Sequence, residues 1–330
     1  MKPVYLLPLL ILLYCAPRER AASPYGSFNE LQPEFRAVID QHAVIEKIGD
    51  GYEWSEGPVW VASEKKLLFS DVPKNTVYQW QEGQPVSVYL TPSGYTGDGT
   101  YSNEPGANGL LLDGDGKLVL CQHGNRQLAR MNAPLHAPAP AFIPIAATFE
   151  GKRFNSPNDV AFFGGDFFFT DPPYGLPMQE NDSTRALAFQ GVFRVTPAGE
   201  VQLLVDSLTR PNGIAFFPDG KSFLVANSDP AKAKWYRYEW NGTEVTGGSI
   251  FYDATAEAAT ERGLPDGLKI DRQGRVFATG PGGIIVFDAK GSVLGKIKLK
   301  EAASNCALSA DEKTLFVTND MLLLKITLRK

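Results

Sequence analysis

Histidine and cysteine are scarce in this 330-residue sequence, which contains three of each. The histidines are His42, His123 and His136. Their spacing assembles no zinc-type ligand cluster with the cysteines. Beyond Cys15, which lies in the N-terminal segment, only Cys121 and Cys306 remain. We expect these two to be small buried thiols in separate strands rather than a disulfide.

Strong charge of one sign is also missing. The formal net charge is −5, and no basic block occurs in the chain. The sequence therefore lacks the electrostatic footprint of a nucleic-acid-binding protein. No nucleic acid is expected among the partners. The expected partner is a small molecule, and the expected assembly is a monomer or a weak dimer.

Long apolar runs are missing except at the N-terminus. "MKPVYLLPLLILLYCA" has a basic start and an apolar run of about a dozen residues, which is too short for an untilted membrane span and typical of a signal peptide. We expect residues 1–22 to export the protein to the periplasm or the medium. No clean cleavage site follows, and "LLYC" loosely resembles a lipoprotein signal. Soluble release, lipid attachment through Cys15 and an unprocessed apolar anchor stay open, and this segment is the one expected route to a membrane.

Glycine and proline, by contrast, are plentiful, with 32 and 24 residues, and indicate many turns. Six segments share one pattern, in which a polar residue precedes an apolar strand, a turn and a second apolar strand. They are "EGPVWVASEKKLLFSD", "NGLLLDGDGKLVLCQ", "NDVAFFGGDFFFTD", "NGIAFFPDGKSFLVAN", "DGLKIDRQGRVFATG" and "NCALSADEKTLFVTN". Further strand-like runs, such as "GVFRVT" and "VQLLVD", follow most of them. Four strands in roughly 40 to 50 residues are the signature of a β-propeller blade.

The sequence therefore predicts an all-β fold, a six-bladed β-propeller with four-stranded blades around a central channel. Residues 35–330 are expected to form this single domain, and residues 23–34 a linker. The sixth repeat ends with only three strands, so a strand near Ala43–Ile48 should close the last blade and remove its exposed edge. Helical periodicity is nearly absent, and only residues 253–263 are expected to form a helical turn or two.

The first residue of every repeat is polar. These residues are Glu56, Asn108, Asn158, Asn212, Asp266 and Asn305. Since the first strand of a blade lines the channel, we expect the six side chains to form a ring there, which we call the inner ring. Glu, Asn and Asp are depleted in strands, and packing alone would not select them six times. Taken singly, each could instead be a turn residue, because Asn-Gly and Asp-Gly are common turn dipeptides.

A second set of residues ends the second strand of each repeat. It comprises Asp71, Gln122, Asp171, Asn227, Gly280 and Asn319, and we call it the second ring. Because the strands of a hairpin run antiparallel, both rings should open on the same face of the propeller.

The inner ring also predicts a metal ion. Carboxylates and amide oxygens that converge on one channel need a partner, and Ca²⁺ accepts six to eight such oxygen ligands. The all-oxygen chemistry disfavours zinc. One divalent metal is expected, with Ca²⁺ the first choice and Mg²⁺, Mn²⁺ or Zn²⁺ as alternatives.

Four dispersed motifs carry a family resemblance: "EGPVW", "SPNDV" with "TDPPYGL", "RPNGIAFFPDG" and "PDGLKID". From about Val44 to the C-terminus, the sequence resembles the gluconolactonase / senescence-marker-protein (regucalcin) family. The resemblance implies a six-bladed propeller with one catalytic divalent metal. It also implies the ligands, which are Glu56, Asn158, Asn212 and Asp266. Asn108 and Asn305 are either ligands or channel-lining or turn-supporting residues, and Asn108 is a candidate substrate contact.

The implied activity is hydrolysis of a lactone ring, typically that of a sugar acid. In this hypothesis the metal polarises the carbonyl and water attacks it. Asp266 is the first candidate for the base that takes the proton of the water. Asp171 is the rival base, or else it orients Asn158.

Other candidate substrate contacts come from blades two and three. Some relatives have an arginine and an asparagine close together in blade three, and here Arg153 and Asn155 precede Asn158. Arg153 is either a substrate contact or a surface residue. His123 either assists the leaving hydroxyl or is satisfied by a loop carbonyl. The loop 91–107, with Tyr95 and Tyr101, is either a lid or a mobile connection.

Two alternatives to a lactonase stay open at this point. One is a related esterase or phosphotriesterase that uses the same metal site. The other is a non-catalytic propeller, stabilised by Ca²⁺, that binds a protein or glycan, because propellers host many functions.

Overall fold

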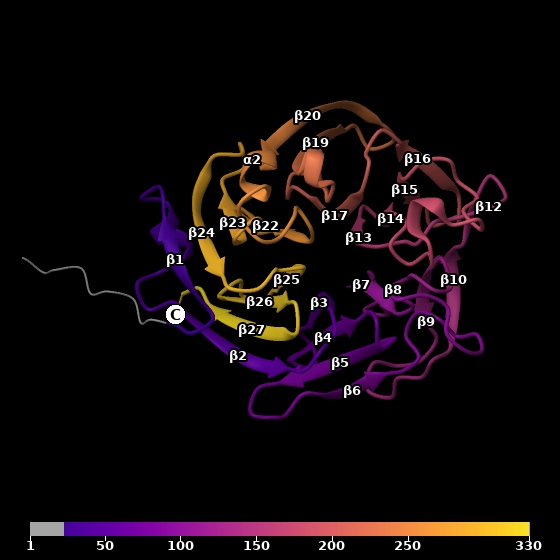
Figure 1. Cartoon of the computed structure of the whole chain (residues 1–330), viewed down its shortest axis with the longest axis horizontal. Coiled ribbons are helices and arrows are strands. Elements are labelled where there is room, and N and C mark those ends of the chain that lie inside the picture. The colour runs from indigo at the N-terminus through magenta and orange to yellow at the C-terminus, as the bar shows by residue number, and fades with distance from the viewer. Residues whose placement is uncertain (1–22, 330) are drawn as a thin grey trace, which may run out of the picture.

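The computed structural model describes residues 23–329, so the predicted export segment 1–22 lies outside the described residues. Six antiparallel sheets stand around a central axis as the blades of a propeller (Figure 1). In Figure 1 the colour runs round the ring from indigo to yellow, because each repeat of the sequence forms the blade next to the preceding one. The predicted six-bladed β-propeller is confirmed.

The first three blades contain four strands each. Blade one is β3 (Ser55–Val61), β4 (Lys66–Asp71), β5 (Thr76–Gln81) and β6 (Ser87–Leu90). Blade two is β7 (Ala107–Leu112), β8 (Leu118–Gln122), β9 (Gln127–Met131) and β10 (Phe142–Ala146). Blade three is β13 (Val160–Phe163), β14 (Asp166–Asp171), β15 (Gly191–Val195) and β16 (Val201–Val205). A short pair, β11 (Thr148–Phe149) and β12 (Lys152–Arg153), precedes blade three, and a 3-10 turn (Gln179–Asn181) lies within it.

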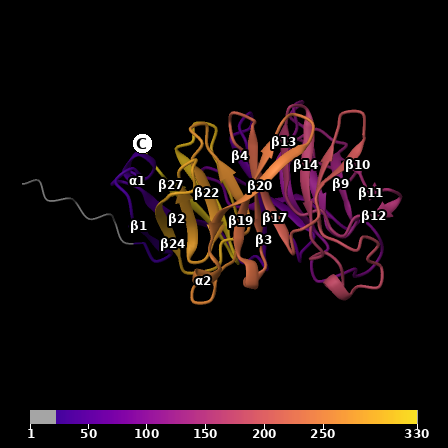
Figure 2. The same ribbon diagram turned by 90° about the horizontal axis from the view of Figure 1, so that it is seen from above.

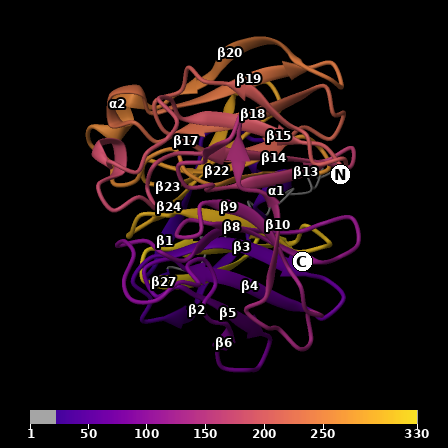
Figure 3. The same ribbon diagram turned by 90° about the vertical axis from the view of Figure 1, so that its right-hand side faces the viewer.

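The last three blades follow the same order from the axis outward. Blade four is β17 (Pro211–Phe216), β18 (Ser222–Asn227), β19 (Lys234–Trp240) and β20 (Val245–Asp253), with a 3-10 turn at Pro230–Lys232. Blade five is β21 (Leu268–Ile270), β22 (Val276–Gly280), β23 (Gly283–Phe287), β24 (Val293–Leu299) and β1 (Gly26–Glu30). Blade six is β25 (Asn305–Leu308), β26 (Thr314–Asn319), β27 (Leu322–Thr327) and β2 (Val44–Asp50). Seen from the side, the strands of blade one lie one beyond another from the axis outward (Figure 3).

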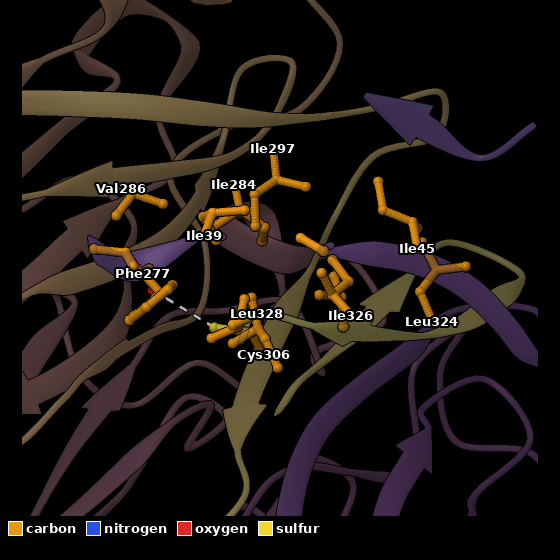
Figure 4. Packing of buried hydrophobic residues seen from close by; sticks show 14 of the residues in the cluster. Ile39, Ile45, Phe277, Ile284, Val286, Ile297, Cys306, Leu324, Ile326 and Leu328 are labelled. Carbon is orange, nitrogen blue, oxygen red and sulfur yellow. Dashed lines mark hydrogen bonds between the residues drawn. The ribbon is translucent and has the colours of Figure 1, made fainter. Parts of the chain in front are cut away.

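The two ends of the chain close the ring together. β2 pairs antiparallel with β27, which confirms the expected closing strand from the N-terminal side. The expectation that residues 23–34 form a linker is corrected by the structure. β1 lies within this segment and pairs with β24, which adds a fifth strand to blade five. The short helix α1 (Phe35–Val38) joins β1 to the closing strand. Its neighbour Ile39 packs with Phe277, Ile284 and Ile326 in the core between blades five and six (Figure 4).

Alternation along the strands builds the core between the blades. In β14, Phe167 and Phe169 pack into the core shared with blade two, whereas Phe168 faces the core shared with blade four. Successive side chains of a strand point to opposite faces, so one aromatic run serves two interfaces. Cys121 and Cys306 are buried free thiols in two separate cores, as expected.

Helical structure is minor. α2 (Thr255–Ala258) forms the expected helical turn and stands on one face of the disc, in the loop between β20 and β21 (Figure 2). Among residues 23–329, no helix has the length and apolar character needed to cross a membrane.

Candidate active site on the propeller axis

A cavity of about 350 Å³ lies on the axis of the propeller, because its walls come from the inner strands and loops of all six blades. Its lining includes five members of the inner ring, which are Glu56, Asn108, Asn158, Asn212 and Asp266. Gly263 and Leu264, from the loop that contains α2, also line it, so the cavity belongs to the face of the disc on which α2 stands. Pairing of β3 with β4 sets Glu56 opposite Ser70, one position from the second-ring residue Asp71.

Glycines explain how the inner strands approach so closely. A Cβ atom on Gly57 would lie 1.9 Å from the carbonyl oxygen of Asn108 in the next blade, and Gly57 has a φ of +48°. A Cβ atom on Gly213 would lie 2.3 Å from the carbonyl oxygen of Asp266. Each glycine follows an inner-ring residue directly. The Glu-Gly and Asn-Gly pairs are therefore close-approach points between blades rather than turn dipeptides.

Asn305 is the member of the inner ring that does not line the cavity. Its Nδ2 lies 3.4 Å from Oε2 of Glu56 and 3.4 Å from Oδ2 of Asp159, and donates to both. Its Oδ1 accepts from Nζ of Lys269 at 3.2 Å. Burial raises the pKa of the Asp159 carboxyl, and the positive charge of Lys269 opposes that shift. Asn305 thus connects Glu56 to a buried acid and its counter-charge.

Hydrogen bonds orient two of the amides that line the cavity. Nδ2 of Asn158 lies 3.5 Å from Nε2 of His123, and Nδ2 of Asn212 donates to Oγ of Ser228 at 3.1 Å. Ser228 in turn donates to the carbonyl oxygen of Pro265. Because the amide nitrogens of Asn158 and Asn212 are engaged by the surrounding protein, the carbonyl oxygen of each is the end left for the cavity.

Several cavity oxygens have no protein partner among the described residues. Oδ1 of Asn108, Oδ1 of Asn158 and Oδ1 of Asp266 are all buried and accept no hydrogen bond. A buried polar atom without a partner costs about 1–3 kcal/mol, so three such atoms in one cavity need an explanation. Oxygen atoms that converge without protein donors are suited to a cation.

The cavity is also acidic. Burial raises the pKa of Glu56 to about 8 and, together with the nearby Glu56 carboxyl, raises the pKa of Asp266. Burial raises the pKa of Glu104, a third acid in the lining, to about 7. Arg210 is the one basic residue of the lining within the described chain, and its guanidinium pairs with Glu180 at 3.0 Å. A cation bound among these acids would hold them ionised.

No group of three or more His, Cys, Asp and Glu side chains suited to a metal occurs in the described part of the chain. The inner ring does not form such a group, because three of its five members that line the cavity are asparagines. Amide oxygens are ordinary ligands of Ca²⁺, so the donor set fits a hard divalent cation.

The second ring has a different role. Oδ1 of Asp71 accepts a hydrogen bond from the backbone N–H of Trp54 at 3.2 Å, and Oδ1 of Asn227 accepts one from the backbone N–H of Arg210 at 2.8 Å. Gln122 donates to a loop carbonyl at 2.8 Å. Each of these side chains fastens the segment that leads into the first strand of a blade, and none of them lines the cavity.

Four of the sequence-predicted site residues do not line the cavity, and they are Asp171, Asn155, Arg153 and His123. Asp171 is fully buried and accepts from the backbone N–H of Asn155 at 2.7 Å, and Nδ2 of Asn155 donates to two carbonyls. Arg153 is exposed and donates to the carbonyl of Asn125 at 3.0 Å. Asp171 therefore supports the loop before Asn158, and neither Asn155 nor Arg153 lines the cavity.

His123 lies behind the lining rather than in it. It is fully buried, with Nε2 beside Asn158 and Nδ1 3.6 Å from Oε2 of Glu104. Burial lowers the pKa of His123 to about 3, so the ring is neutral and its Nε2 can accept from the Asn158 amide. His123 thus contacts two lining residues, Asn158 and Glu104.

The loop 91–107, for which the sequence left a lid and a mobile connection open, is fastened to blade one. Oδ1 of Asn75 accepts from the backbone N–H groups of Ser93, Gly94 and Tyr95 at 3.0, 2.7 and 3.2 Å. Tyr95 stacks on Tyr101 with the ring centroids 5.0 Å apart, and neither residue lines the cavity. These bonds describe an anchored connection rather than a lid.

Sequence reasoning missed five polar or aromatic residues of the lining. They are Trp54, Glu104, Tyr174, Arg210 and Ser228. Four of them have a sequence signal, because Trp54 and Arg210 lie two positions before inner-ring residues and Tyr174 and Ser228 come shortly after second-ring residues. Glu104 has no such signal, since a long loop carries it to the cavity.

The fold and the site place this protein in the class of six-bladed propellers with an oxygen-lined cavity on the axis. Residues 54–320 match the model of the SMP-30/Gluconolactonase/LRE-like region. The chain belongs to this family, as its motifs predicted.

Proteins that are similar to this chain in sequence or structure are named as lactonases. A gluconolactonase of Zymomonas mobilis subsp. mobilis is 37% identical over 305 residues, which cover 90% of this chain and 84% of the relative. A pentonolactonase of Haloferax volcanii is 26% identical and covers 80% of each chain. The solved structure of a gluconolactonase from Xanthomonas campestris superposes with a TM-score of 0.80 at 29% identity, covering 94% of this chain and 99% of the other. These similarities confirm the prediction of a lactonase-class enzyme.

Proposed function

We propose that the protein is a metal-dependent lactonase that opens the ring of a polyhydroxylated lactone, such as the lactone of a sugar acid. The observation that carries this proposal is the convergence of inner-ring oxygens on one cavity, where Oδ1 atoms of Asn108, Asn158 and Asp266 have no protein partner. The named lactonases among the relatives support the same reaction class.

Glu56, Asn158, Asn212 and Asp266 would hold the cation. Two carboxylates and two amide oxygens are hard donors, which favour Ca²⁺, with Mg²⁺, Mn²⁺ and Zn²⁺ as alternatives. When bound, the cation would supply Lewis-acid polarisation of the lactone carbonyl. A carboxylate held by a cation stays ionised and loses basicity, so Asp266 is suited to ligation and less suited to taking a proton.

The remaining lining residues suit a hydroxylated ring. Asn108 offers a free Oδ1 that can accept a hydrogen bond from a substrate hydroxyl. Arg210 is half-buried at the cavity, where its guanidinium can donate to hydroxyl or carboxylate oxygens of substrate and product. The indole of Trp54 gives one wall an apolar surface. A cavity of about 350 Å³ falls in the usual size range of small-molecule sites.

The test is metal removal and restoration on the purified protein. Chelator-treated protein should lose hydrolysis of glucono-lactone and regain it with added Ca²⁺, measured as acid release above the spontaneous rate. Full activity after complete metal removal would contradict the proposal. Parallel assays with a carboxylic ester and a phosphotriester distinguish the related hydrolases. Tight Ca²⁺ binding without turnover of any of these substrates would favour a binding module.

A further inference from the structure

Glu104 is the acid of the cavity that does not belong to the inner ring. It lies four residues before Asn108, in the loop between β6 and β7. Backbone hydrogen bonds fix the chain beside it: the N–H of Gly106 donates to the carbonyl of Val72 at 2.9 Å, and the carbonyl of Pro105 accepts from Gly124 at 3.2 Å. The loop therefore presents the Glu104 side chain at a fixed place in the cavity wall.

The Glu104 carboxylate is not engaged by a strong partner. Its one ion-pair contact among the described residues is with Nδ1 of His123, and this contact is long, at 3.6 Å. The other titratable groups of the same cavity are Glu56, Asp266, Tyr174 and Arg210, of which Arg210 is already paired with Glu180. The side chain keeps 31% of its surface exposed, so it is accessible from the cavity.

Resting on the proposed function, we propose that Glu104 is the catalytic residue that accepts and returns the proton during ring opening. As the oxygen of a water molecule bonds to the lactone carbonyl carbon, one O–H bond of the water breaks and its proton passes to the Glu104 carboxylate. When the bond between that carbon and the ring oxygen breaks, Glu104 returns the proton to the ring oxygen. The product is a hydroxy acid, water is the only co-reactant, and Glu104 is again ionised.

The division of work between Glu104 and Asp266 follows from their positions. Asp266 starts the inner strand of blade five, and its buried Oδ1 belongs to the converging set of oxygens. Glu104 comes from a loop at the wall of the same cavity. Burial of its carboxyl group, which raises the pKa of Glu104 to about 7, suits a group that must both take and release a proton near neutrality.

The test compares Glu104→Gln with Asp266→Asn. Glu82→Gln is a matched control, because Glu82 follows β5 at the end remote from Asp71, on the face of the disc opposite the cavity. Each purified, metal-loaded variant is assayed on glucono-lactone for kcat, KM and the pH profile of kcat. Calorimetric titration of the metal-free protein with Ca²⁺ gives affinity and stoichiometry, and thermal unfolding checks the fold.

Glu104→Gln should lower kcat by about 10²- to 10⁴-fold with little change in KM, and the rise of kcat on the acid side of the pH profile should disappear. Its Ca²⁺ affinity should stay close to that of the wild type, whereas Asp266→Asn should weaken Ca²⁺ binding. Glu82→Gln should match the wild type throughout.

Two results would overturn the assignment of Glu104. One is a Glu104→Gln variant that keeps its kcat, and the other is a variant that loses Ca²⁺ binding, since Glu104 would then be a ligand. Failure of the proposed function is a separate outcome, because the wild type itself would then show no metal-dependent lactone hydrolysis.

Discussion

The inner ring and the second ring use similar residues at neighbouring ends of the same hairpins, yet their polar atoms have different partners. In the inner ring, Oδ1 of Asn158 is buried without a protein donor. In the second ring, Oδ1 of Asn227 accepts from a loop N–H at 2.8 Å and its Nδ2 donates to the carbonyl of Lys232 at 2.9 Å. The second ring lies one strand farther from the axis than the inner ring. At that distance the side-chain oxygen contacts loop backbone and does not face the cavity. The comparison shows that residue type alone does not distinguish a metal ligand from a side chain that fastens a loop.

Asn158→Ala should have the largest effect on function. Loss of the Asn158 amide removes one oxygen from the cavity, so we expect kcat/KM for lactone hydrolysis to fall by about 10²- to 10³-fold, the size seen when one preorganised polar group is removed from an active site. Ca²⁺ affinity, measured by calorimetry, should fall as well. The unfolding temperature in chelator should change little, because the lost Oδ1 has no protein partner and the lost contact of Nδ2 with Nε2 of His123 is long, at 3.5 Å. Unchanged Ca²⁺ affinity would remove Asn158 from the ligand set.

Asn227→Ala is the matched change in the second ring and should act on stability instead. It removes two part-buried hydrogen bonds, one from the backbone N–H of Arg210 and one to the carbonyl of Lys232, at a cost of about 0.5–1.5 kcal/mol each. Chemical unfolding of the metal-free protein should show this loss, while one Ca²⁺ still binds. If Asn227→Ala abolished Ca²⁺ binding in folded protein, the distinction between the two rings would fail.

The sequence was sufficient to predict the repeats, the blade count and the members of the inner ring. This worked because hairpin periodicity and ring position are local: Asn158 and Asn212 follow from counting along one blade. Their role could not be separated from that of Asp171 in the same way, since antiparallel geometry brings both ring positions to one face. Only the hydrogen bond from the backbone N–H of Asn155 shows that Asp171 fastens the loop before Asn158. Glu104 was missed because its loop is fixed by contacts to distant segments that no local pattern records.

Arg210 contacts a second-ring residue and also lines the cavity. Its substitution should have a smaller effect on activity than that of Asn158. Its backbone is held by Asn227, while its guanidinium reaches the cavity. Arg210→Met should raise KM for a polyhydroxylated lactone by about 10-fold, the loss of about 1.4 kcal/mol of charge-assisted hydrogen bonding. Ca²⁺ affinity should not weaken. Arg36→Met, which removes an exposed ion pair with Glu30, is the control. An unchanged KM would show that the guanidinium serves only its pair with Glu180.

Asp171→Asn should have the smallest effect on activity and a distinct effect on the pH dependence of stability. Burial raises the pKa of Asp171 to about 7, above the value of about 3.9 in an unfolded chain. The folded protein therefore binds more protons at this site between pH 4 and 7, and the contribution of Asp171 to stability falls as pH rises through this range. An asparagine carbonyl can still accept from the N–H of Asn155, and it does not ionise.

The free energy of unfolding of Asp171→Asn, relative to the wild type, should consequently rise between pH 5 and pH 8. Urea unfolding of both proteins in chelator at the two pH values measures this difference. Turnover of the metal-loaded variant should stay within a few-fold of the wild type, because Asp171 does not line the cavity. A relative stability that falls with pH would mean that the buried carboxylate is ionised and held by nearby arginines. A large loss of turnover in a well-folded variant would instead support Asp171 as the base. The second ring would then contribute a catalytic residue.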